Sequence, residues 1–485
     1  MHSIDFLVFL IFTGGVVLLG ASFWRRKSSS DEFTSAGRNL PGWVVGMSIF
    51  STYVSSISYL AYPGKAFDSN WNAFVFSLSI PVASWIAAKW FVPFYRRQSS
   101  VSAYSFLEER FGKWARWYAS MCYLLTQIAR IGTIMYLLAL PMNMLLGWDF
   151  QTVILVTSIA VIVYSLLGGV RGVIWTEAIQ GILMIGGAVA CLGILLYSMP
   201  NGTVAGLSEA WNQGKFSLGS FDITKIGEST FWVCLVYGIF INLQNYGIDQ
   251  NYVQRYHAAR SERSARFSAL FGGWLYIPIS AIFFLIGTSL YCYYSNYPSM
   301  LPEGGIKGDY AFPFFIVHQL PVGITGLLIA SIFAAGMSTV ATSITSSSTV
   351  ILADYYLRFR PKASDAEKMW VLKIAGMIIG VLGICISLAL VSVESALDAW
   401  WKLSSIFSGG MLGLFLLGII PQKVRNVDAA IGVVCGVLVI AWISIDQFLG
   451  LPTSGIHEYM AIVFGTVVIF LVGFLLTKLW MYRKG

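Results

Sequence analysis

Residues 327–352, LLIASIFAAGMSTVATSITSSSTVIL, are long and apolar enough to cross a bilayer, yet they carry ten hydroxyl side chains and no formal charge. Apolar spans normally avoid polar atoms, because hydrocarbon offers no water to satisfy them. A row of neutral oxygens on one helix face suits a hard monovalent cation such as Na⁺. The alternative is that these hydroxyls ease helix packing and bond to their own turn. For the cluster as a whole we favour a cation path, and the hydroxyls at helical spacing are Ser338, Thr339, Thr342, Ser343, Thr345 and Ser346.

The composition places the whole chain in a membrane. Of 485 residues, 57% are hydrophobic and only 11% are charged, far below the charged fraction of a soluble domain. The six cysteines are scattered, with no CxxC pair, so neither a metal cluster nor a disulfide framework is indicated. The net charge of +8 is no sign of nucleic-acid binding, because most basic residues fall in short loops between apolar segments.

Thirteen apolar segments predict a polytopic all-α membrane protein that forms a single membrane domain over residues 1–485. The first segment is too long for a signal-peptide core and is expected to be retained. The predicted spans are 4–24, 43–63, 71–95, 117–145, 150–169, 174–199, 230–253, 268–294, 320–357, 371–392, 397–420, 428–448 and 458–480.

Basic residues alternate between the loops. Most loops that follow odd-numbered spans hold clusters of Lys and Arg, with Arg255 counted in the loop after the seventh span and Arg171 alone after the fifth, whereas the other loops hold only isolated Lys. This asymmetry predicts an N-terminus outside and a C-terminus in the cytoplasm. Two outer loops, 200–229 and 295–319, are expected to be lids or surface caps. The short outer loops suit a bacterial inner membrane, although Asn201 in Asn-Gly-Thr would also fit glycosylation in a eukaryote.

The second span is also rich in hydroxyls. It carries Pro63 and Gly64 at its end, and both discourage a straight helix. A helix broken at membrane depth is tolerated where it lines a cavity, and its freed carbonyls can bind a cation. Packing through hydroxyls is the alternative. The hydroxyl residues of this span are Ser51, Thr52, Ser55, Ser56 and Ser58, of which Thr52, Ser55 and Ser58 are candidates for binding substrate.

Arg130 lies well inside the fourth span. A guanidinium in hydrocarbon is costly and requires a partner, and its planar fork suits a carboxylate. We favour a substrate carboxylate; the alternative is an ion pair with Asp249, Glu177 or Asp398. Lys402, in the eleventh span, either contacts substrate or extends to the outer surface.

Amide side chains gather in the seventh span, where sugar hydroxyls or neighbouring helices are their expected partners. No nucleophile–base set, Walker motif or HExxH motif occurs, so neither an enzyme nor an ATP-driven pump is expected. The polar residues of this span are Asn242, Gln244, Asn245 and Asp249.

Four strings together resemble the sodium:solute symporters of the sodium/glucose cotransporter family. They are FTSAGRNLPGW (33–43), GGVRGVIWTEAIQG (168–181), DQNYVQRY (249–256) and FAAGMSTVATSITSSST (333–349). Within the family, VSSISYLAYPGKAFDSNW and QIARIG look most similar to bacterial sodium/sialic acid symporters.

The resemblance implies the leucine-transporter fold, with inverted repeats over 43–199 and 230–420, an extra helix at 4–24 and two helices over 428–480. It also implies a sodium site made by the carbonyls of Ser51, Val54 and Ala335 with the hydroxyls of Ser338 and Thr339. Arg130 would bind the carboxylate of a sialic acid, with Ser55 and Ser58 beside it, while Ser77 stands where such members have glutamine. A second sodium site would fall on Tyr53, Glu177, Ala341 and Thr342, but Tyr53 and Ala341 depart from the usual ligands, so one Na⁺ is expected.

The resulting hypothesis is a monomeric Na⁺ symporter that imports sialic acid, or a related acidic sugar, by alternating access. A neutral sugar, amino acid or vitamin is the alternative substrate. A membrane sensor or a channel is the alternative outside symport.

Overall fold

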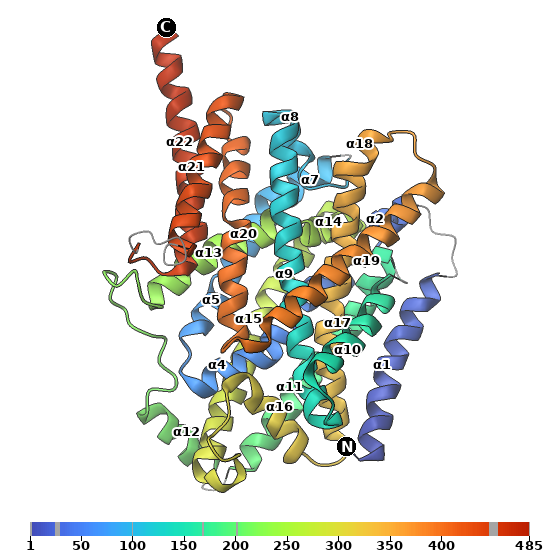
Figure 1. The fold of residues 1–485 in the computed structure, drawn as a ribbon, viewed down its shortest axis with the longest axis vertical. Helices are drawn as coiled ribbons and strands as arrows, with labels where there is room; N and C mark the ends of the chain where they lie inside the picture. Colours follow the sequence, from blue (N-terminus) through green and yellow to red (C-terminus); the bar gives the residue numbers. More distant parts are fainter. Residues whose placement is uncertain are drawn as a thin grey trace.

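The computed structural model describes residues 2–24, 30–98, 100–166, 169–199, 202–445 and 454–484. These residues fold into helices, and the only β-type pairing among them is an isolated bridge between Leu40 and Ala259. The helices stand side by side in one bundle, with the two chain ends at opposite ends of it (Figure 1). Opposite ends agree with an odd number of crossings.

The predicted spans are present as helical segments. Eleven are long and apolar enough to cross a membrane, and a bent helix pair brings the number to twelve in the described chain. The thirteenth, α10, is shorter but apolar. The segments are α1 (Ser3–Trp24), α3 (Gly42–Tyr53) with η2 (Ile57–Ala61) and α4 (Tyr62–Asp68), η3 (Asn72–Phe74) to α7 (Val92–Arg97), α9 (Lys113–Leu146), α10 (Phe150–Ser165), α11 (Gly169–Tyr197), α13 (Phe231–Ile248), α15 (Glu262–Asn296), α17 (Ile324–Val350) with η6 (Ile351–Tyr356), α19 (Asp365–Ala389), α20 (Ala396–Ile419), α21 (Asn426–Ile445) and α22 (Ala461–Lys484).

Short elements connect these spans. The two predicted outer loops contain helices, α12 and α16, that hydropathy alone did not indicate. Positions 167–168, 201 and 446–448, which bear on predicted span ends and on Asn201, lie outside the described residues. The connecting elements used below are α2 (Ser30–Ser35), α8 (Ser105–Phe111), α12 (Thr203–Asn212), α14 (Gln250–Ala258), α16 (Gly308–His318) and η8 (Glu458–Met460).

Capping side chains set several helix boundaries. Ser364 and Glu367 form a capping box at the start of α19, and Thr230 caps α13. Asp249 ends the predicted span 230–253 early, because its carboxylate accepts a hydrogen bond from the Asn251 amide and starts α14 as a separate helix. The seventh span therefore stops at Ile248 rather than at 253.

The second span is broken, but not where Pro63 and Gly64 predicted. α3 ends at Tyr53, Val54 is extended, and α3 meets the following helix at 58°. The Ser55 hydroxyl accepts a hydrogen bond from the Ile57 amide and so replaces a lost helical acceptor. Pro63 sits in the first turn of α4, where a missing N–H is tolerated.

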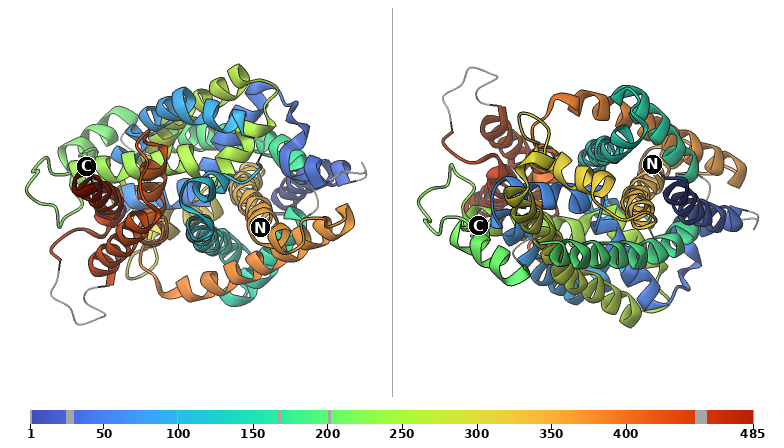
Figure 2. Two further views of the ribbon diagram at one scale, coloured as in Figure 1. Left: turned by 90° about the horizontal axis from the view of Figure 1, so that it is seen from above. Right: turned by 90° about the horizontal axis from the view of Figure 1, so that it is seen from below.

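The hydroxyl-rich helix α17 occupies the interior of the bundle. Views along the bundle show α1 at one edge and the pair α21 and α22 at the opposite edge (Figure 2). α1 packs on α17, where the Asp5 carboxylate accepts hydrogen bonds from the amides of Gly323 (2.6 Å) and Gly326 (3.1 Å). Asp5 thus satisfies backbone donors at the start of α17 that have no helical acceptor.

Candidate functional site

The break in α3 lies against the middle of α17, and buried neutral oxygens meet there. The Ser338 hydroxyl lies 3.2 Å from the Ser51 carbonyl and 2.9 Å from the Ala335 carbonyl. The Thr339 hydroxyl lies 3.2 Å from the same Ala335 carbonyl. Val54, at the end of α3, is also buried. The structure therefore gathers four of the five predicted sodium ligands by direct contact and places the fifth at the adjacent break.

A partly open cavity lies beside this junction. Four predicted substrate residues line it: Ser55, Ser58, Arg130 and Asn245. The other side chains of its wall are Tyr53, Ile57, Tyr62, Phe76, Thr126, Gln127, Tyr237, Ile241, Asp249, Tyr276, Trp400, Trp401 and Ser404. Such a wall, largely aromatic with a few polar groups, is typical of a small-molecule site.

Three predicted substrate residues contribute differently. Ser77 is buried against Ser280, with the two hydroxyl oxygens 2.7 Å apart. The Asn242 amide donates to the Ser79 hydroxyl at 2.8 Å and its oxygen accepts from the Tyr53 hydroxyl. Neither Ser77 nor Asn242 is among the residues that line the cavity. Thr52 stays buried, and its backbone carbonyl rather than its side chain reaches toward Arg130.

Arg130 reaches the cavity from α9 without a carboxylate partner. Its side chain is only 8% exposed, Nη2 donates to the Thr52 carbonyl at 2.6 Å, and the guanidinium lies 6.0 Å from the Trp400 ring centroid. Within the described parts of the chain, none of the three candidate acids is within 4.0 Å of Arg130. Glu177 pairs with Arg255, and Asp398 pairs with Lys65. Arg130 therefore retains donors for an anionic ligand.

Thr52 connects the cavity to the sodium-type oxygens. Its carbonyl accepts from Arg130 Nη2 at 2.6 Å, and the Thr339 hydroxyl lies 3.5 Å from the same oxygen. A cation at the α3–α17 junction and an anion on Arg130 would therefore act on one backbone carbonyl. The Thr52 carbonyl thus lies between Arg130 and one of the predicted sodium ligands, Thr339.

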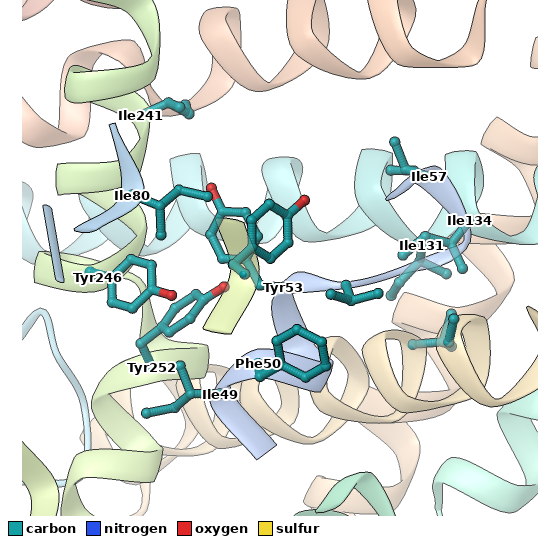
Figure 3. Packing of buried hydrophobic residues seen from close by; sticks show 14 of the residues in the cluster. Ile49, Phe50, Tyr53, Ile57, Ile80, Ile131, Ile134, Ile241, Tyr246 and Tyr252 are labelled. Carbon is teal, nitrogen blue, oxygen red and sulfur yellow. The ribbon is translucent and has the colours of Figure 1, made fainter. Parts of the chain in front are cut away.

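Aromatic rings form the wall around Tyr53. Its ring centroid lies 4.7 Å from that of Tyr276, 5.8 Å from that of Tyr246 and 6.2 Å from that of Tyr252. Figure 3 shows Tyr53 near Tyr246 and Tyr252, with Ile49 and Phe50 of the same helix close by. The cluster fixes the residue that follows Thr52 and leaves little freedom at the end of α3.

Glu177 belongs to a buried network that adjoins the sodium-type oxygens, because the Ser51 hydroxyl donates to its backbone carbonyl at 2.7 Å and the Thr52 hydroxyl lies 3.4 Å from its carboxylate. Its carboxylate accepts hydrogen bonds from Arg255 Nη2 (2.6 Å) and from the hydroxyls of Ser48 and Thr342. Arg255 also donates to the Thr342 hydroxyl at 2.5 Å. The carboxylate that would belong to a second sodium site is thus neutralised by a guanidinium. Tyr53, another residue of that set, directs its hydroxyl to Asn242.

Arg255 was expected in a basic surface loop, and that prediction was wrong. The residue is 2% exposed and its partner Glu177 is 0% exposed. The DQNYVQRY string contained the residue, but only the fold brings α14 against α11 and α17. Lys402 pairs with Glu458 of η8 and is not among the cavity-lining residues, so it has a protein partner rather than a cavity role.

Two ion pairs join helices toward opposite ends of the bundle. Lys65 of α4 meets Asp398 of α20 at 2.8 Å, and Arg255 of α14 meets Glu177 of α11. Figure 1 places α4 toward one end of the bundle and α14 toward the other. The two ion pairs therefore lie toward opposite ends of the bundle (Figure 1).

The chain is similar to known sodium-coupled transporters over almost its whole length. The sodium/sialic acid symporter NanT of Aliivibrio fischeri is 29% identical over 98% of this chain and 92% of its own length. The sodium/sialic acid symporter SiaT of Proteus mirabilis is 32% identical over 91% of this chain and 90% of its own.

A solved structure of a Na⁺-coupled sialic acid symporter in a substrate-bound outward-open state matches with a TM-score of 0.89 and 30% identity. The match covers 99% of this chain and 98% of that one. It confirms the predicted leucine-transporter fold. The profile of the sodium:solute symporter family matches residues 33–436. The chain therefore belongs to the sodium:solute symporter family.

Proposed function

We propose that the protein imports sialic acid, or a closely related acidic sugar, together with one Na⁺. The shared Thr52 carbonyl carries this proposal, because it joins an unpaired arginine in the cavity to the neutral oxygens at the α3–α17 junction. The two sodium/sialic acid symporters described above and the similar solved structure support the substrate class. Arg130 would bind the carboxylate, with Ser55 and Ser58 beside it.

The sodium ion is transported with the substrate, and its gradient supplies the free energy for uptake. Ser51, Val54 and Ala335 would supply carbonyls, and Ser338 and Thr339 hydroxyls. The Arg255–Glu177 pair supports one Na⁺ per transport cycle, because the Arg255 guanidinium already neutralises the Glu177 carboxylate that a second sodium site would use. A tenfold sodium gradient then supplies about 1.4 kcal/mol per cycle.

Alternating access connects these parts. Sodium joins α3 to α17, substrate fills the cavity, and the Lys65–Asp398 and Arg255–Glu177 pairs bridge the two exits in turn. The transport unit would comprise repeats at 43–199 and 230–420, with 4–24 and 428–480 added outside them. It would act as a monomer in a bacterial inner membrane, with its N-terminus outside and its C-terminus in the cytoplasm.

Purified protein tests the proposal. Thermal unfolding is followed with sialic acid, glucose, proline and pantothenate, each in sodium or in choline. We expect the largest rise in melting temperature for sialic acid, and only in sodium, because bound ligands stabilise the native state. Uptake into proteoliposomes should show the same preference. Equal uptake in choline would refute sodium coupling, and a preference for glucose, proline or pantothenate would refute the acidic sugar.

A further inference from the structure

A second charged group faces the cavity besides Arg130. Asp249, between α13 and α14, lines the cavity and is only 1% exposed. Its Oδ1 accepts the Asn251 amide hydrogen at 2.8 Å, and its Oδ2 accepts from Gln127 Nε2 at 3.3 Å. In the described segments, no Lys, Arg or His nitrogen lies within 4.0 Å of this carboxylate.

The capping role of Asp249 does not explain its charge. Asparagine caps helices about as well as aspartate, so starting α14 requires an acceptor but no carboxylate. An ionised carboxylate offers about four acceptor sites, and the protein uses two. A buried charge with unfilled acceptors is costly, so a ligand that fills them has a strong advantage.

Gln127 fixes the position of this carboxylate relative to Arg130. Gln127 and Arg130 are three residues apart on α9, on one helix face, and both line the cavity. Gln127 donates to Asp249 and accepts from the Asn251 side-chain amide at 3.0 Å. The cavity wall thus presents the Arg130 guanidinium and, held by Gln127 one helical turn away on α9, a carboxylate that can accept hydrogen bonds.

We propose that Asp249 binds donor groups of the substrate, its hydroxyls or amide N–H, while Arg130 binds the substrate carboxylate. This inference rests on the proposed function and adds a selectivity residue to it. An acid that carries several hydroxyls satisfies both charged groups. A simple monocarboxylate satisfies Arg130 only and leaves Asp249 buried and unfilled, so the cavity rejects it.

The test compares Asp249→Asn with the wild type. Binding is measured by competition against labelled sialic acid and by thermal shift, with unlabelled sialic acid and with pyruvate. Asparagine keeps the cap and the size of the side chain but removes the charge. We expect the affinity for sialic acid to fall about 10–100-fold, while that for pyruvate stays the same or rises, so the selectivity ratio collapses. Asp249→Ser, which also caps, provides a second variant should the first unfold.

Two control variants separate this role from general charge effects. Glu458→Gln makes the same chemical change outside the cavity and should leave the ratio unchanged. Arg130→Lys should weaken sialic acid and pyruvate alike. An unchanged ratio in Asp249→Asn overturns the inference. If the ratio is unchanged and the variant has a lower Hill slope for sodium, Asp249 belongs to a cation site instead. If the ratio is unchanged and the pH dependence of binding is lost, Asp249 is a proton site instead.

Failure of the proposed function would look different. If the wild type binds no acidic sugar but binds another hydroxylated solute, the substrate proposal fails. The Asp249 inference is then decided with that solute and its deoxy analogue: the variant should lose discrimination between the two, and retained discrimination overturns it.

Discussion

Thr339 shows how one side chain can set sodium affinity. Its hydroxyl lies on the face of α17 that meets the α3 break, 3.5 Å from the Thr52 carbonyl. Thr339→Val keeps the shape and removes the oxygen. We expect the sodium concentration for half-maximal uptake to rise about tenfold, the scale of effect seen when metal-site support is lost. Sodium titration of sialic acid uptake in proteoliposomes measures it.

The matched control for that variant lies on the same helix. The Thr345 hydroxyl donates to the Ala341 carbonyl at 2.8 Å, within its own turn. Thr345→Val should leave the sodium titration unchanged. Equal effects of both substitutions, or none at Thr339, would argue against a sodium ligand at that position.

At the scale of elements, one buried ion pair fastens α14 to α11. Removing one partner of the Arg255–Glu177 pair leaves an uncompensated buried charge, which typically costs about 3–5 kcal/mol. We expect Glu177→Gln and Arg255→Met each to lower the melting temperature strongly. The double variant should lose less than the sum of the two. Thermal unfolding of the wild type, the two single variants and the double variant in detergent gives all the values needed for the double-mutant cycle.

An exposed pair provides the comparison. Lys402 and Glu458 are 39% and 42% exposed, so replacing one partner of this pair should change the free energy of unfolding by at most about 1 kcal/mol. Additive effects of the Glu177 and Arg255 substitutions would show that the pair does not hold the two helices together.

For the whole molecule, the stoichiometry decides how transport responds to voltage. One Na⁺ with one carboxylate moves no net charge, whereas each net charge would gain about 2.3 kcal/mol from 100 mV. We expect initial uptake rates of sialic acid to be nearly independent of an imposed potassium diffusion potential. Strong acceleration at inside-negative potential would show that a second sodium crosses or that the solute is neutral.

The sequence predicted the architecture and part of the site. Long apolar segments can be recognised without knowing their neighbours, so each of the thirteen predicted segments is helical in the described chain, and eleven or, with the bent pair, twelve of them are long and apolar enough to span a membrane. The hydroxyl rows on spans two and nine and Arg130 stood out because polar groups in hydrocarbon are rare. These signals are local, and each can be read without knowing which helices touch.

The remaining features depend on contacts between distant segments. Arg255 looked like a loop residue because its acid partner lies 78 positions away along the chain. Ser77 and Asn242 were candidates for the cavity, but Ser280 and Ser79 bind them. The second span breaks at Val54 rather than at the predicted Pro63, because the Ser55 side chain, rather than a proline, supplies the local alternative to a helical hydrogen bond.

The bond between Asp5 and the start of α17 has a practical consequence for spectroscopy. Because α1 is tied to the helix that carries Ser338 and Thr339, a label on α1 reports the position of α17 from the edge of the bundle (Figure 2). Leu18 of α1 is 73% exposed on the outside of the bundle, where a fluorophore displaces no packed side chain. Energy transfer from there to a label on α4 would follow the second half of the broken helix relative to α17, without any probe near the ligands.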